Sequence, residues 1–339
     1  MKHLVLTFAL LAPLACAQDN QAAQTTIPDN AAATAETASP RDSGEPVTET
    51  VSAAEPVQSD NDPVFQYHLG QEYALRRDYP TAREWFGKAA AQNNAEAQTA
   101  LGILDYYGIA PGKQRDAAKW FAKAAKQNHP AAYDWQGNLA ADNQNPAQAR
   151  QKYSRAAERG STSAMRHLGL AWLKGKGGAQ SAEEARTWLE KAATGQPADA
   201  TAMRHLALDI YHAGKGGVSA DNKQALDWLQ RASDAGDSTA ALILGQIYRR
   251  GDWGETADEN KACAYYAKSA EQNGGLPAAL ILQTLQHQQK CADIPPAILP
   301  ADNNSRQYWP QERALQALQT LEATPPAASS PVPSLAESP

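Results

Sequence analysis

Residues 63–291 repeat one pattern six times, and this repetition constrains the fold more than any other feature of the chain. In each copy an aromatic residue comes shortly before Lys or Arg and then Ala or Ser. Successive copies lie 35, 32, 36, 40 and 37 residues apart, counted from Ala89, Ala124, Ala156, Ala192, Ala232 and Ser269. A period of this length is typical of solenoids, in which one repeat cannot bury its apolar face alone and stacking supplies the core.

A second marker divides each repeat into two parts. It is a Leu-Gly pair or a close variant: Leu69-Gly70, Leu101-Gly102, Gln136-Gly137, Leu168-Gly169, Leu206-Ala207 and Leu244-Gly245. Small residues and Leu surround it at helical spacing, and Asn, Gly, Asp and Pro cluster at the joints. We therefore predict an all-α solenoid of about six helix pairs. The expected wedges between neighbouring helices are the aromatic residues Trp85, Trp120, Tyr153, Trp188, Trp228 and Tyr265.

Repeat five carries a family resemblance. It reads Ala-Met-Arg-His-Leu-Ala-Leu-Asp-Ile-Tyr over residues 202–211, followed by a Gly-rich turn at Gly214 to Gly217 and by Trp228-Leu229. This is similar to the Sel-one-like repeat, a relative of the tetratricopeptide repeat, although Ala207 replaces the usual Gly. The resemblance covers about residues 63–291. It implies a right-handed superhelical α-solenoid that binds proteins, and exported bacterial members include scaffold lipoproteins of cell-envelope and exopolysaccharide machinery.

The N-terminus has the pattern of an export signal. A short basic start precedes an apolar run from Leu4 to Leu14, which predicts a signal peptide over residues 1–17. Two cleavage interpretations stay open. Ala15-Cys16-Ala17 fits general signal peptidase and would leave Gln18 first, whereas Leu14-Ala15-Cys16 resembles a bacterial lipoprotein signal with a lipidated Cys16. The expected location is periplasmic or secreted, and membrane attachment is expected only through an outer-membrane lipid anchor on Cys16.

The net charge of −6 comes from one segment. Residues 18–62 form an Ala/Pro/Thr-rich linker with nine acidic residues and one basic residue, and this composition predicts disorder. The Pro/Ala/Ser-rich tail at 324–339 is also expected to be disordered. Residues 63–323 are nearly neutral, with 29 basic and 27 acidic side chains. A neutral, exported body gives no indication of a nucleic-acid partner.

Two features lie at the C-terminal end of the array. Cys263 and Cys291 fall at the adjoining ends of an expected antiparallel hairpin, which predicts a disulfide, with two free thiols as the alternative. Residues 292–323 are expected to cap the solenoid, because Leu315, Leu318 and Leu321 share one face of a predicted helix.

The sequence contains no organised catalytic, cofactor or metal site. Lys174 to Gly178 lacks the spacing of a phosphate-binding loop. His68, His167 and His205 occupy one equivalent position in their repeats, which places them too far apart for one metal ion and predicts partly exposed surface side chains. Neither the Gly-x-Ser-x-Gly nor the Ser-x-x-Lys motif occurs. We therefore expect no enzyme activity and no cofactor.

The resulting hypothesis is an exported scaffold that binds an unidentified cell-envelope protein on the concave face of the solenoid. The sequence indicates no oligomeric state. Alternatives are a cell-wall-directed enzyme or enzyme inhibitor, and a saccharide-facing component of an exopolysaccharide export complex. The expected contact residues are a small basic ladder and the aromatic residues outside the repeat marker: Arg166, Arg204, His167, His205, Trp135, Trp172 and Trp253.

Overall fold

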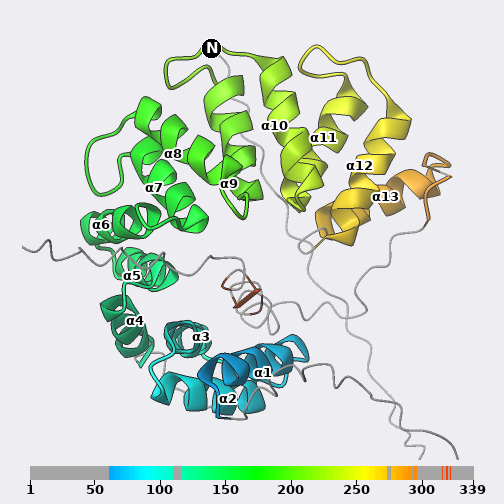
Figure 1. Ribbon diagram of the computed structural model, residues 1–339. Coiled ribbons are helices and arrows are strands. Elements are labelled where there is room, and N and C mark those ends of the chain that lie inside the picture. Colours follow the sequence, from blue (N-terminus) through cyan, green and yellow to red (C-terminus); the bar gives the residue numbers. More distant parts are fainter. Residues whose placement is uncertain are drawn as a thin grey trace, which may run out of the picture. The chain divides into compact units, whose positions relative to one another are not determined.

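The computed structural model describes residues 61–109, 116–272, 276–291 and 293–295, with positions 315, 318, 319 and 321 further on. The predicted signal peptide, Cys16, most of the linker and the tail lie outside these residues. Within them, every regular element is a helix (Figure 1). The helices are α1 (Pro63–Leu75), α2 (Tyr79–Ala91), α3 (Ala95–Tyr106), α4 (Ala117–Lys126), α5 (Pro130–Asp142), α6 (Pro146–Ala157), α7 (Thr162–Lys174), α8 (Ala182–Thr194), α9 (Ala200–His205), the π-helix η2 (Leu206–His212), α10 (Asn222–Asp234), α11 (Ser238–Arg250), α12 (Glu259–Glu271) and α13 (Leu276–His287).

Consecutive helices pack as pairs, and each pair is one repeat. The most extensive contacts join α1 with α2, α3 with α4, α5 with α6, α7 with α8, and α11 with α12, while α9 and η2 together pack on α10. Each second helix also contacts the first helix of the following repeat, so that the pairs form one continuous stack (Figure 1). The predicted α-solenoid of six helix pairs is thus confirmed, and α13 packs on α12 as one further first helix.

A glycine of the first helix receives a large side chain of the second helix in five of the six repeats. An added Cβ on Gly102 would lie 2.4 Å from Cε1 of Phe121, and one on Gly137 would lie 2.4 Å from Cε1 of Tyr153. Gly70, Gly169 and Gly245 face Phe86, Leu189 and Tyr266 in the same way. The glycine of the Leu-Gly marker is therefore needed because the two helices of a repeat approach so closely that a methyl group at this position would clash with the second helix.

The side chain that packs against the glycine stands one position after the aromatic residue that the sequence pattern predicted. Phe86, Phe121, Leu189, Leu229 and Tyr266 are almost wholly buried, whereas the preceding Trp or Tyr of each repeat is only half-buried. Only in repeat three does the predicted residue, Tyr153, fill the site.

The tryptophans of the second helices instead pair with the basic residue of the repeat marker. Lys88 Nζ lies 3.6 Å from the centre of the Trp85 ring, and Lys191 Nζ lies 4.4 Å from that of Trp188. Lys123 with Trp120 and Arg231 with Trp228 repeat the contact at 4.3 and 5.0 Å. A cation over an indole face three residues away explains why Trp and Lys or Arg recur together.

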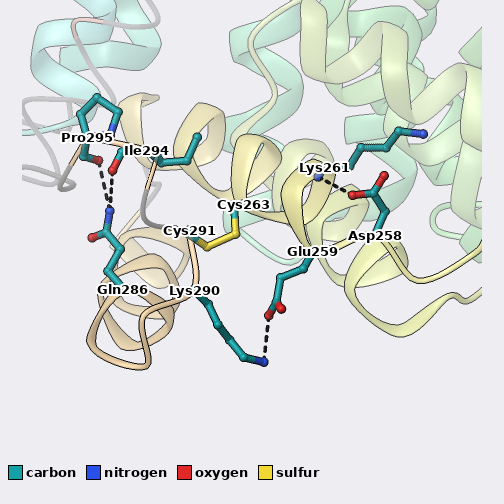
Figure 2. Close-up of a disulfide and its surroundings, with 9 residues drawn as sticks. All are labelled: Asp258, Glu259, Lys261, Cys263, Gln286, Lys290, Cys291, Ile294 and Pro295. Atoms are coloured by element: carbon teal, nitrogen blue, oxygen red, sulfur yellow. Dashed lines mark hydrogen bonds and ion pairs between the residues drawn. A yellow bond between two sulfur atoms is a disulfide. The ribbon is translucent and has the colours of Figure 1, made fainter.

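A disulfide joins α12 to the chain just after α13 (Figure 2). Cys263 and Cys291 have Cα atoms 5.5 Å apart, and both residues belong to a buried apolar cluster with Tyr266 and Leu282. Beside it, Lys290 Nζ lies 2.9 Å from Glu259 Oε1, a second link between the same two segments. The covalent bond therefore closes the last hairpin of the stack.

The described residues of the predicted cap segment, 292–323, lie in two places. Ile294 packs against the apolar cluster around the disulfide, as expected for a cap. Leu318 and Leu321, its described buried residues, belong to the apolar cluster of α1 to α5 together with Tyr67, Leu104 and Ala131. They are not members of the cluster around the disulfide. The Leu spacing indicated a helical face correctly, but the surface that this face covers is that of the first repeats.

Candidate interaction surface

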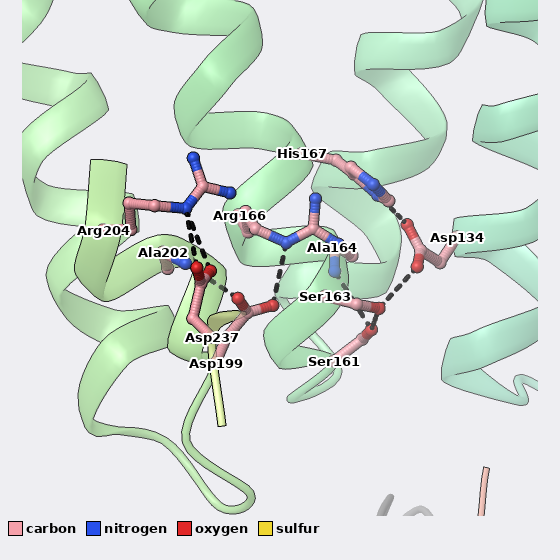
Figure 3. Close-up of polar contacts among 10 residues, drawn as sticks. All are labelled: Asp134, Ser161, Ser163, Ala164, Arg166, His167, Asp199, Ala202, Arg204 and Asp237. Atoms are coloured by element: carbon pink, nitrogen blue, oxygen red, sulfur yellow. Dashed lines mark hydrogen bonds and ion pairs between the residues drawn. The ribbon is translucent and has the colours of Figure 1, made fainter. Parts of the chain in front are cut away.

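Two arginines of the first helices bind the first turn of the next first helix (Figure 3). Arg166 Nε on α7 donates to Asp199 Oδ2 at 2.9 Å, and Arg204 Nε on α9 donates to Asp237 Oδ2 at 2.9 Å. Asp199 and Asp237 are also the N-cap residues of α9 and α11, accepting from Ala202 N at 2.8 Å and Ala240 N at 2.7 Å. Each carboxylate thus starts one helix and holds the preceding repeat.

Repeat three makes the corresponding link with the carboxylate on its own first helix and the hydrogen-bond partners of this carboxylate on the next one. Asp134 of α5 accepts from Ser163 Oγ at 2.5 Å and lies 2.8 Å from Nδ1 of His167, both on α7 (Figure 3). Burial would raise the pKa of Asp134, but His167, Ser163 and Arg166 outweigh it and hold this pKa below the usual range of a carboxyl. The ionised carboxylate therefore joins α5 to α7.

Repeat two uses a neutral pair at the same position. Thr99 Oγ1 on α3 lies 3.1 Å from Nδ1 of His129, the N-cap residue of α5. Burial lowers the pKa of His129, although Glu96 opposes the shift. The four first-helix residues of these links occupy one position, three residues before the marker glycine or its alanine equivalent: Thr99, Asp134, Arg166 and Arg204. One series of polar links therefore crosses four successive repeat boundaries. We call it the polar ladder.

The basic ladder expected from the sequence is therefore not a free cationic surface. The side chains of Arg166 and Arg204 are 20% and 19% exposed, and both guanidinium groups are paired with carboxylates. His167 is bound to Asp134, and His205 Nδ1 lies 2.7 Å from Asp209 Oδ2 on the same helical segment. The constant separation of 33 residues between each Arg and its Asp was the sequence signal for these pairs.

The three tryptophans predicted as contact residues are half-buried and contact different partners. Trp135 stacks on Phe121 with ring centres 5.8 Å apart. Trp172 lies beneath the guanidinium of Arg150 at 3.4 Å, and Trp253 stacks on His212 at 4.1 Å. Each of these rings packs against at least one neighbouring side chain, so these tryptophans serve the fold and leave only part of their surface exposed.

The position directly after the marker glycine is buried in repeats one and two and half-buried in repeats three to six. We call these positions the post-glycine row: Gln71, Ile103, Asn138, Leu170, Leu208 and Gln246. Leu170, Leu208 and Gln246 are half-buried, and the two leucines pack at the edge of the core of the later repeats. The ladder ties α7, α9 and α11 together beside them, which gives these half-exposed side chains a fixed spacing.

A pocket of about 470 Å³ opens beside Leu170. Its apolar lining includes Ala149 and Ala171, and its basic lining includes Arg150, Lys174 and Lys176. The pocket lies between repeat three, which lacks the Gly-rich turn, and repeat four, which has one. An apolar lining with basic groups suits a protein segment that carries both apolar and acidic side chains.

The described residues hold no group of three or more His, Cys, Asp or Glu side chains arranged to bind a metal ion. In the same part of the chain, no helix is long and apolar enough to cross a membrane.

The fold and this surface define an α-solenoid of two-helix repeats. The model of the Sel1 repeat matches residues 63–94, 95–129, 140–161, 162–196, 200–237 and 238–274, more than half of the chain. The chain therefore belongs to the Sel1 repeat family, whose repeats form protein–protein interaction scaffolds.

One solved structure supports this assignment, and two others show a weaker likeness that carries no argument of its own. A Sel1 repeat protein from Oxalobacter formigenes is 30% identical, with a TM-score of 0.55, and the match covers 62% of this chain and 86% of that one. The protective antigen c5321 of uropathogenic Escherichia coli, which displays an SLR fold, is 25% identical with a TM-score of 0.49, over 74% of this chain and 54% of that chain. The immunity protein Pa5087 from Pseudomonas aeruginosa is 19% identical with a TM-score of 0.48, over 60% and 81%. No protein with a curated description matches the sequence.

Proposed function

We propose that this chain is an exported, non-enzymatic scaffold that binds a cell-envelope protein on the first-helix surface of repeats four to six. The observation that supports the proposal most directly is the pocket beside Leu170, with half-exposed Leu170 and Leu208 in one row next to it. Central apolar anchors beside charged groups are the usual composition of a protein-binding surface.

The polar ladder supports the same assignment. It fixes the spacing of α7, α9 and α11 through pairs that are largely shielded from solvent, so that a partner meets a surface that is already ordered. Preorganisation of this kind reduces the entropy lost on binding. The arginines of the ladder act as internal struts of the surface and are not its contact groups.

Site-specific photo-crosslinking tests the binding surface. A photoreactive amino acid at Leu170 in the full chain, expressed in its native cell, should form one discrete crosslink to another protein. The matched control carries the same amino acid at Thr187, which is exposed on the second helix α8. Absence of a crosslink at position 170, or the same crosslink at both positions, would contradict the proposed surface.

Export and anchoring are tested separately. Radiolabelled palmitate should label the wild-type chain and not Cys16→Ser if Cys16 is the lipidated first residue. A mature N-terminus at Gln18 without label would instead support the general cleavage site. A cytoplasmic protein that retains Met1 would contradict export under either interpretation.

A further inference from the structure

Two positions of the first helix, the polar-ladder position and the post-glycine position, are buried in repeats one and two and half-buried in repeats four and five. In repeats one and two the residues at these positions are 5% exposed or less: Tyr67, Gln71, Thr99 and Ile103. At the same two positions Arg166, Leu170, Arg204 and Leu208 are all half-buried. In each of these repeats the two helices pack on each other, and the difference lies in what covers the first helix.

α3 shows the contrast most clearly. Nine consecutive residues, Ala97 to Asp105, are buried, whereas α7 buries five residues out of 13. A helix that packs on its neighbours along two sides retains a third side facing solvent. In α3 this third side is covered, and Ile103 on it is completely buried.

The chain's own C-terminal segment supplies a cover. Leu318 and Leu321 are 3% and 4% exposed and belong to the same apolar cluster as Tyr67 and Ile103. Leu315 is half-buried and Gln319 is exposed, so the described positions of the segment divide into a buried and an exposed side. Leucines at every third position are the anchors of an amphipathic helix that lies in a groove.

We propose that the first helices of repeats one to three form a groove for a leucine-bearing amphipathic helix, and that the segment carrying Leu315, Leu318 and Leu321 is its built-in occupant. A partner helix with Leu at the same spacing binds this groove by displacing the segment. This groove is distinct from the surface of repeats four to six. The proposal for the groove does not depend on the function proposed for that surface.

The segment is covalently attached to the solenoid and therefore competes with a partner helix for the groove. Nineteen residues lie between Pro295, the last residue of the described stretch after α13, and Leu315. A stretch of that length spans up to about 70 Å when extended, and tethering over such distances gives an effective concentration of roughly millimolar. The apparent affinity of a partner helix is therefore reduced by the fraction of molecules in which the segment occupies the groove.

The test uses the full chain and a fluorescein-labelled synthetic peptide of residues 310–323. Leu318→Asp/Leu321→Asp should release the segment and bind the peptide at least tenfold more tightly than the wild type, measured by fluorescence anisotropy. Gln319→Asp is the control on the exposed side: it adds one negative charge, where the released variant adds two, and should behave as the wild type. Adding Ile103→Gln, which introduces the residue of the equivalent position in repeat six, should abolish the binding gained.

Equal peptide affinity of the wild type and the released variant would overturn the proposal, provided that both retain the same helical circular dichroism. If the aspartate variant does not fold, Leu318→Ala/Leu321→Ala provides the same comparison with a milder change. A concentration-dependent dimer of the wild type that disappears in the released variant would also overturn it, because the segment would then occupy the groove of a second copy.

Discussion

Gly102 and Phe121 approach so closely that a Cβ on residue 102 would fall 2.4 Å from Cε1 of the ring. This contact joins α3 to α4, and equivalent contacts join the helices of four other repeats. In repeat five Ala207 stands at the glycine position, and the wedge there is Leu229. The first helix of that repeat changes to a π-helix from Leu206 onward, at the place where its sequence departs from the others.

Gly102→Ala should therefore destabilise the protein by about 1–3 kcal/mol, because the added methyl group displaces a buried ring. Chemical unfolding measures the change. Gly87→Ala on α2 is the matched control, since an added Cβ there meets nothing within 4 Å, and it should be neutral or stabilising by up to about 1 kcal/mol. Phe121→Leu in the Gly102→Ala background should recover part of the loss. Equal effects of the two alanine substitutions would contradict the packing described.

The disulfide between Cys263 and Cys291 predicts that intact-mass analysis after alkylation without reduction finds neither thiol modified. The double variant Cys263→Ser/Cys291→Ser should lose roughly 3–4 kcal/mol, as expected for a loop of 28 residues. A count of two alkylated thiols in the native, oxidised protein would show that the bond does not form.

The pair of Arg204 and Asp237 should show a coupling energy of about 1–2 kcal/mol in a double-mutant cycle, because both side chains are largely shielded from solvent. Asp237→Asn suits this cycle, since Asn retains the N-cap of α11. The exposed pair of Arg231 and Asp227 is the control, with side chains 56% and 57% exposed and an expected coupling below about 0.5 kcal/mol. Similar coupling energies in the two pairs would contradict a role of the polar ladder in joining the repeats.

Acidification should weaken the fold through His129. Burial holds the pKa of this residue below its unfolded value of 6.5, so the unfolded chain takes up the proton first. The stability associated with neutral His129 is therefore complete above about pH 6.5 and falls as the pH drops below that value. Thermal unfolding from pH 7.5 to 5 should show a smaller decrease for His129→Gln than for the wild type. An equal decrease in His129→Gln and the wild type would contradict this role of His129.

The repeat markers were sufficient to predict the helix pairs, but they did not identify which side chain is the wedge. Trp85 and Phe86 are adjacent, and both have an alanine four residues later because Ala89 and Ala90 follow in sequence. Helical spacing is thus satisfied by either residue, and only the position of the neighbouring glycine selects Phe86.

The candidate contact residues were harder to predict for a related reason. Arg166 and Arg204 appeared free because their partners stand 33 residues away, at the start of the next first helix. Leu318 and Leu321 were recognised as one face of a helix, but spacing within a segment carries no information about which distant surface that face covers. Contacts between repeats therefore required the structure.

The most direct test of the central claim is the affinity of the partner identified by crosslinking for two single variants of the full chain. Leu170→Asp places a charge beside the pocket, and Thr187→Asp places the same charge on the exposed side of α8. We predict that Leu170→Asp raises the Kd at least tenfold and that Thr187→Asp leaves it unchanged, with both variants keeping the wild-type circular dichroism. An unchanged Kd for Leu170→Asp would contradict binding on the first-helix surface.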